Sequence, residues 1–96
     1  MTTLDAVRQH RSEILALARK HGAANVRIFG SVLRGDDGPN SDIDLLIDVP
    51  GPTSPWFPAG LILDLEALLA RKIDVVTERG LNSFIRDQVL EEAQPV

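Results

Sequence analysis

Two aspartates separated by one residue are the side chains in this chain best suited to chemistry. Asp42 and Asp44 flank Ile43 at the start of an apolar run. Side chains alternate faces along a strand, so we expect both carboxylates on one face, with their bases about 6–7 Å apart. Ile43 and Leu45 would then point into an apolar layer. Carboxylate oxygens are ligands that Mg²⁺ prefers, so the pair predicts a metal site at a strand end.

A Gly-Ser pair lies upstream of these aspartates, at the end of another apolar run. Residues 25–29 are expected to form a short strand, after which Gly30 and Ser31 turn the chain into a stub of helix that Gly35 ends. Backbone N–H groups at such a turn can bind phosphate. Taken alone, the pair is equally well explained as a turn glycine and a helix cap. Beside two carboxylates, it predicts a joint site for phosphate and Mg²⁺.

The spacing of these two features resembles a known signature. Gly30-Ser31 is followed by ten residues and then by Asp-Ile-Asp at 42–44. This pattern resembles the GSx10DxD signature of the DNA polymerase β-type nucleotidyltransferases. The short chain and the Arg34-Gly35 pair are similar to the minimal nucleotidyltransferases (MNT). Those proteins are typically the antitoxins of HEPN/MNT toxin–antitoxin pairs.

The resemblance implies a set of site residues. It implies a third carboxylate on a later strand, and Asp74, within the apolar run 73–77, matches that position. Asp42, Asp44 and Asp74 would be catalytic and would hold Mg²⁺, with two ions expected. Gly30, Ser31 and Arg34 would bind the phosphates of ATP. Because a charge within an apolar strand is costly unless it is paired or metal-bound, Asp74 is the most informative residue outside the motif.

Arg34 has two interpretations that its position leaves open. Its guanidinium suits a phosphate contact. It could equally form an ion pair with Asp36, Asp37 or the motif aspartates; Asp36 and Asp37 themselves are expected to be solvated loop charges. Gly30 and Gly35 also match the opening of a P-loop, but Asp36 and Asp37 stand where that motif needs Lys and Ser or Thr. A P-loop is therefore rejected.

Apolar periodicity predicts the elements that hold these residues. An amphipathic helix of about five turns is expected from Leu4, with Thr3 as its N-cap and His21-Gly22 at its end. Residues 59–70 form a second helix and 73–77 a third strand. A last helix is expected to have Asn82 or Ser83 as its N-cap. It would be lined by four apolar residues, Phe84, Ile85, Val89 and Leu90.

The expected architecture is an α/β (α+β) fold of the polymerase β-like nucleotidyltransferase type. Three strands would form a small mixed sheet with helices mainly on one face. The other face would carry the carboxylates in an open cleft. Residues 49–58 contain four of the six prolines and are expected to be a loop. Within it, Trp56 and Phe57 could anchor the loop, or contact a nucleotide base or a partner.

Composition limits the classes of protein that fit. The 96 residues are expected to form one domain, 1–96, and 44% hydrophobic with 25% charged residues is ordinary globular composition. A net charge of −4 argues against nucleic acid as the main ligand. Without cysteine there is no disulfide or thiolate metal site, and without a long apolar run there is no membrane segment. We therefore expect a soluble cytoplasmic protein.

The functional hypothesis combines the residues with the resemblance. The chain is expected to transfer AMP from ATP to a hydroxyl, with tyrosine the expected acceptor, on a cognate HEPN ribonuclease toxin. A chain of this size has little surface to enclose a nucleotide, so a partner should complete the site. Two alternatives stay open: a non-catalytic antitoxin that acts by binding and occlusion, and a nucleotidyltransferase that acts on a small-molecule hydroxyl.

Overall fold

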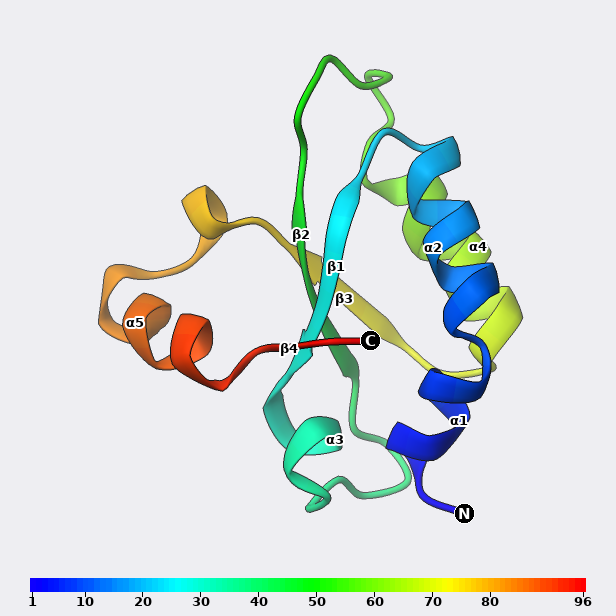
Figure 1. Ribbon diagram of the computed structural model, residues 1–96, viewed down its shortest axis with the longest axis vertical. Coiled ribbons are helices and arrows are strands. Elements are labelled where there is room, and N and C mark those ends of the chain that lie inside the picture. Colours follow the sequence, from blue (N-terminus) through cyan, green and yellow to red (C-terminus); the bar gives the residue numbers. More distant parts are fainter.

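A four-stranded mixed sheet crosses the middle of the molecule in the computed structural model, which describes all 96 residues (Figure 1). The strands are β1 (Ala24–Phe29), β2 (Ile43–Asp48), β3 (Ile73–Val76) and β4 (Gln94–Pro95). Their order is β3-β2-β1-β4; β2 and β3 are parallel, and β1 is antiparallel to both β2 and β4. The mixed sheet is as predicted, but three strands were expected. The two-residue β4 is too short to show any periodicity.

Three helices cover one face of this sheet. They are α1 (Thr3–Gln9), α2 (Arg11–Lys20) and α4 (Ala59–Leu69), which lie together on the right of Figure 1. Ile14 of α2 and Leu61 of α4 pack in one apolar cluster with Ile28 and Leu45 of the sheet, and all four are at most 1% exposed. Burying each such side chain contributes roughly 1.5–3 kcal/mol. This layer fixes the sheet whose other face carries the aspartates.

The N-terminal segment forms two helices, so the prediction of one continuous helix is wrong. The chain leaves helical geometry at His10, whose φ and ψ are −95° and 16°. Thr2 rather than Thr3 is the N-cap: its hydroxyl accepts from the Asp5 N–H, and the Asp5 carboxylate accepts from the Thr2 N–H, both at 3.1 Å. Apolar residues keep helical spacing across the break, so periodicity could not reveal it.

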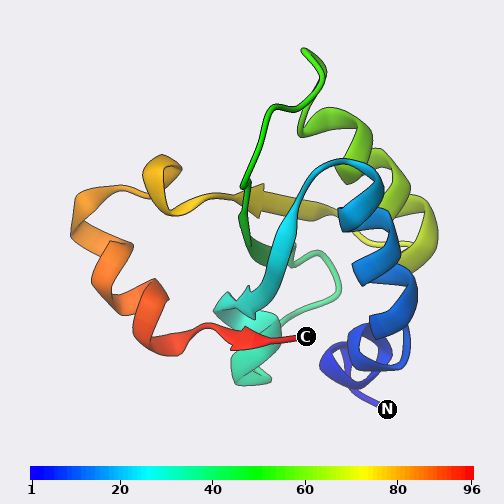
Figure 2. The same cartoon turned by 45° about the horizontal axis from the view of Figure 1, so that its top comes forward.

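The second face of the sheet is partly covered by the C-terminal segment. Helix α5 (Ser83–Glu92) lies on the opposite side of the sheet from α2 and α4 (Figure 2). Val89 of α5 packs with Leu46 and Leu81, all at most 7% exposed. Of the four apolar residues predicted to line this helix, only Val89 is buried, and Phe84 is 93% exposed. The face is therefore less open than expected, although most helices do cover the other side.

Two shorter segments complete the fold. Helix α3 (Gly30–Arg34) follows β1 directly, and Gly35 ends it in the left-handed region at φ 80°. The 3₁₀ turn η1 (Glu78–Gly80) links β3 to α5. In the proline-rich loop, Phe57 packs against the core and Trp56 is 79% exposed. No helix has both the length and the apolar character needed to cross a membrane.

Candidate active site

The parallel pairing of β2 and β3 brings two of the predicted carboxylates side by side. Asp44 and Asp74 are direct partners in the register, each the second residue of its strand. Paired residues of neighbouring strands point to the same face. Asp42 lies two residues before Asp44, just outside β2. The structure therefore gathers Asp42, Asp44 and Asp74 at one end of two parallel strands.

The pKa of Asp44 reflects both its burial and the carboxylates beside it. Burial, followed by the charges of Asp74 and Asp42, raises the pKa of Asp44 from 3.8 to about 6. Asp44 is half-buried, whereas Asp42 and Asp74 are exposed. The expected burial cost of Asp74 is therefore wrong, because β3 is an edge strand with an open flank. Here the placement of Asp74 beside Asp44, rather than its burial, is the informative feature.

The three carboxylates form a donor set suited to Mg²⁺. All their donors are oxygens, and burial together with repulsion from Asp74 and Asp42 raises the pKa of Asp44, an unfavourable environment for the carboxylate that a bound cation would relieve. In this structure, however, no group of three or more His, Cys, Asp or Glu side chains is arranged so that it could hold a metal ion, so these carboxylates would have to move closer together to bind one. Asp42, Asp44 and Asp74 are the residues that would hold the ion, and their grouping on an exposed edge leaves room for phosphate oxygens and water as further ligands.

Gly30 connects the Gly-Ser turn to Asp44. Its φ is +80°, a conformation that side-chain-bearing residues rarely adopt. A Cβ at this position would overlap the Oδ2 atom of Asp44. The lack of a side chain thus lets the end of β1 approach the carboxylate on β2. Ser31 follows in the first turn of α3 and is half-buried. The turn and the carboxylates consequently form one continuous site.

A carboxylate that sequence reasoning missed lies on this turn. The Gly30 N–H donates to Glu92 Oε2 at 3.3 Å, and Arg34 Nη1 donates to Glu92 Oε1 at 2.6 Å. Arg34 Nε also donates to Asp36 Oδ2 at 3.4 Å. The ion-pair interpretation of Arg34 therefore describes this structure, and Glu92 raises the pKa of Arg34. No sequence spacing pointed to Glu92, because it lies 62 positions from Gly30.

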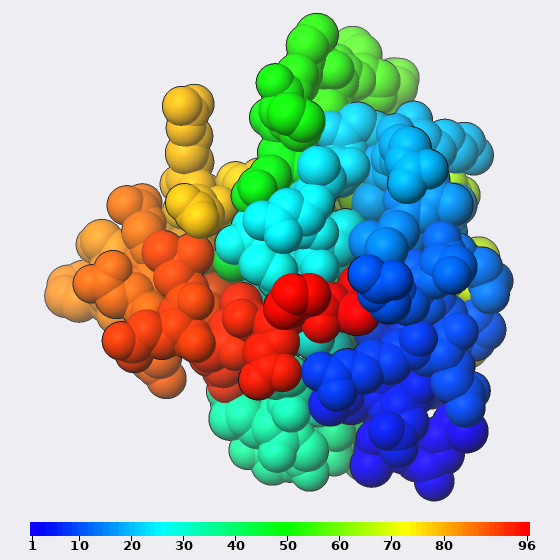
Figure 3. Space-filling model, in the orientation of Figure 1, coloured from blue at the N-terminus to red at the C-terminus, as the bar shows by residue number.

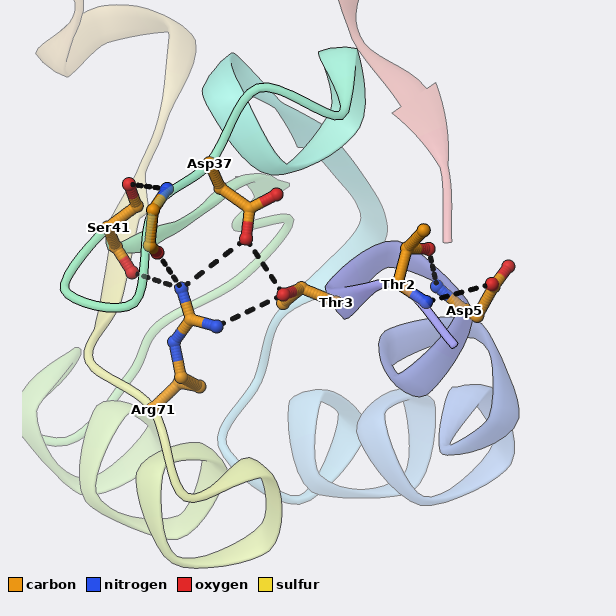
Figure 4. A network of polar contacts seen from close by, with 7 residues as sticks. Thr2, Thr3, Asp5, Asp37, Ser41 and Arg71 are labelled. Atoms are coloured by element: carbon orange, nitrogen blue, oxygen red, sulfur yellow. Dashed lines mark hydrogen bonds and ion pairs between the residues drawn. The ribbon is translucent and has the colours of Figure 1, made fainter.

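Arg71 organises the loop that leads into the aspartate pair (Figure 4). Its guanidinium reaches four groups: Ser41 O at 2.7 Å, Gly38 O at 3.2 Å, Thr3 Oγ1 at 3.1 Å and Asp37 Oδ2 at 3.7 Å. The Thr3 hydroxyl also donates to Asp37 at 2.8 Å. Asp37, whose side chain is 13% exposed, is therefore not the solvated loop charge that was expected. Since Ser41 directly precedes Asp42, Arg71 fixes the loop segment that leads into Asp42.

The fold and this site define the class of protein. Residues 8–96 match the family model described as "Nucleotidyltransferase domain", so the chain belongs to that family. Within it, the chain is 33% identical over 96 residues to a protein of Thermococcus cleftensis named protein adenylyltransferase MntA, covering 96% of this chain and 94% of that protein. The predicted resemblance to the MNT antitoxins is confirmed.

Solved structures support the same assignment. One described as a minimal nucleotidyltransferase shares 44% identity, covers 100% of this chain and 97% of its own, and superposes with a TM-score of 0.85. The fold is also that of the MNT antitoxin in a complex with tri-AMPylated Shewanella oneidensis HEPN toxin, at 19% identity and a TM-score of 0.67, covering 92% of this chain and 69% of that one. A toxin–antitoxin complex with AMP-PNP gives 23% identity and a TM-score of 0.73, covering 88% and 70%.

Proposed function

We propose that this chain is an antitoxin that transfers AMP from ATP to a hydroxyl of a cognate HEPN ribonuclease toxin, with a tyrosine as acceptor. The observation that carries the proposal is the pairing of Asp44 with Asp74 beside the Gly30 turn. The name of the Thermococcus relative and the AMPylated HEPN toxin bound to an MNT antitoxin of the same fold support this substrate class.

The reaction is an in-line displacement at the α-phosphorus. The acceptor oxygen forms a bond to this phosphorus, the bond to the bridging oxygen breaks, and pyrophosphate leaves. Asp42, Asp44 and Asp74 would hold Mg²⁺, which supplies charge neutralisation when bound. Asp74 is exposed at the edge of the sheet, where it can accept the proton of an approaching hydroxyl. Ser31 and the turn around it would position the phosphates. No covalent intermediate on this chain is required.

The position of the site favours a protein acceptor. Asp42 and Asp74 are exposed, so a partner surface can bring its own hydroxyl to them. The net charge of −4 complements a basic RNA-binding surface, and the exposed Trp56 is a candidate contact. An added AMP would place a negative phosphodiester where the toxin accepts an RNA phosphate. Repulsion and bulk would both then oppose RNA binding.

An intact-mass assay tests the proposal. Purified HEPN toxin is incubated with this protein and ATP–Mg²⁺, with the Asp44→Asn variant as control. We expect the toxin to gain the mass of one or more AMP groups, on tyrosine by peptide mapping, and to stay inactive after the antitoxin is removed. A toxin of unchanged mass that is inhibited only while bound would support occlusion. Transfer of AMP to a small-molecule hydroxyl, with no change in the toxin, would support the other alternative.

A further inference from the structure

The C-terminal end of α5 reaches into the Gly-Ser turn. In Figure 3 the last part of the chain (orange to red) meets α3 (teal) on the face in view. The Glu92 carboxylate makes this connection, with one oxygen on the Gly30 N–H at 3.3 Å and the other on Arg34 at 2.6 Å. Its side chain is 20% exposed. The Glu92 carboxylate therefore already binds Gly30 and Arg34, two of the three residues predicted to bind the nucleotide phosphates.

We propose that Glu92 determines the affinity of the site for triphosphate, because its carboxylate competes with the phosphate oxygens for Gly30 and Arg34. This inference rests on the proposed function. A carboxylate and a phosphate oxygen seek the same donors, and a 2.6 Å bond to a guanidinium is a strong, charge-assisted one. Nucleotide can use these donors only by exchanging with Glu92.

The negative charge of Glu92 also lowers the affinity of the site for triphosphate. Arg34 already faces two carboxylates, Glu92 and Asp36, so little of its positive charge is left for an incoming anion. Glu92 also adds a negative charge near the cluster formed by Asp42, Asp44 and Asp74. An anionic ligand is therefore opposed by repulsion as well as by competition. Because Glu92 is on α5, any contact that moves the end of this helix would change nucleotide affinity.

The Glu92→Gln substitution isolates the charge, because the amide oxygen can still accept a hydrogen bond from Gly30 or Arg34. The matched control is Glu91→Gln, which removes the same charge from the exposed neighbouring residue. Calorimetry would measure the Kd of AMP-PNP with Mg²⁺ and, as a probe of phosphate alone, of inorganic tripolyphosphate. We expect Glu92→Gln to lower both Kd values about tenfold, and Glu91→Gln to change them less than about twofold.

Unchanged or weaker binding by Glu92→Gln would overturn the inference, and weaker binding would instead make Glu92 a residue that positions the turn or holds the metal. If neither the wild type nor the variants bind either probe, the proposed function fails as well. Binding by the wild type with no gain in the variant contradicts only the role of Glu92.

Hydrogen exchange on the wild type provides a second test that needs no variant. AMP-PNP should speed exchange in the last turn of α5, and slower exchange there would contradict displacement of Glu92.

Discussion

Asp44 and Asp74 lie side by side in the parallel pairing of β2 and β3, although 30 positions separate them in the chain. Each is the second residue of its strand, so both carboxylates lie at the same end of the sheet. Parallel strands need a long connection, and here α4 provides it on the opposite face. The crossover therefore stays off the carboxylate face, which α5 covers only in part. The following predictions test the roles proposed for residues on that face.

Replacing Asp44 or Asp74 by Asn should abolish AMP transfer without unfolding the protein. Each variant keeps the side-chain volume but removes a negative charge that the metal needs. We expect the transfer rate, measured by toxin mass against time, to fall about 100-fold or more. Asp87→Asn, at an exposed position of α5, is the control and should retain full activity. A variant of Asp74 that keeps normal activity would remove this residue from the mechanism.

Asp44 should destabilise the metal-free protein at neutral pH. Its pKa is raised in the folded state to about 6, from 3.8, so its unfavourable contribution is full above about pH 6 and disappears as the pH falls to about 3.8. With allowance for partial exposure, Asp44→Asn should raise the melting temperature by about 3 °C at pH 7.5 in EDTA. The gain should vanish near pH 4. An equal gain at both pH values would show that charge is not its cause.

The Gly30→Ala and Gly35→Ala substitutions separate backbone strain from crowding of the site. Both glycines have a φ of +80°, so each alanine should destabilise the fold by about 1 kcal/mol. Only a Cβ at Gly30 meets Asp44, whereas a Cβ at Gly35 meets no atom within 4 Å. Gly30→Ala should therefore also weaken binding of AMP-PNP with Mg²⁺. Similar loss of binding in both variants, measured by calorimetry, would contradict the close approach of Gly30 to Asp44.

Arg71 should position Asp42 through the loop that precedes it. Arg71→Gln removes the bonds to the carbonyls of Gly38 and Ser41, and leaves Asp37 without its cation. We expect a loss of about 1–3 kcal/mol in stability and a several-fold rise in the Kd for Mn²⁺, used as a spectroscopic substitute for Mg²⁺. Lys72→Gln, at the exposed neighbouring position, should alter neither. Arg71→Lys keeps the positive charge and should restore part of the metal affinity. If Arg71 only stabilises the fold, the Kd for Mn²⁺ should not change in Arg71→Gln.

The features that could be predicted from sequence are those that depend on short-range patterns. Alternation along residues 42–47 placed Asp42 and Asp44 on one face, and the Gly-Ser turn followed a recognisable strand. Spacing between these motifs then indicated the family, which the comparisons confirmed. The roles of Asp42, Asp44, Asp74, Gly30, Ser31 and Arg34 in catalysis and binding stay predictions.

Tertiary structure alone decided which distant groups meet at the site. Glu92 contacts Gly30 across 62 positions, and Arg71 contacts Ser41 across 30. Such contacts depend on how α5 and α4 pack against the sheet, and no local periodicity encodes that packing. The break at His10 was missed because helical apolar spacing continues across it, and β4 was missed because two residues show no periodicity. The amino-acid pattern determined the elements and the paired aspartates, while long-range packing determined what surrounds them.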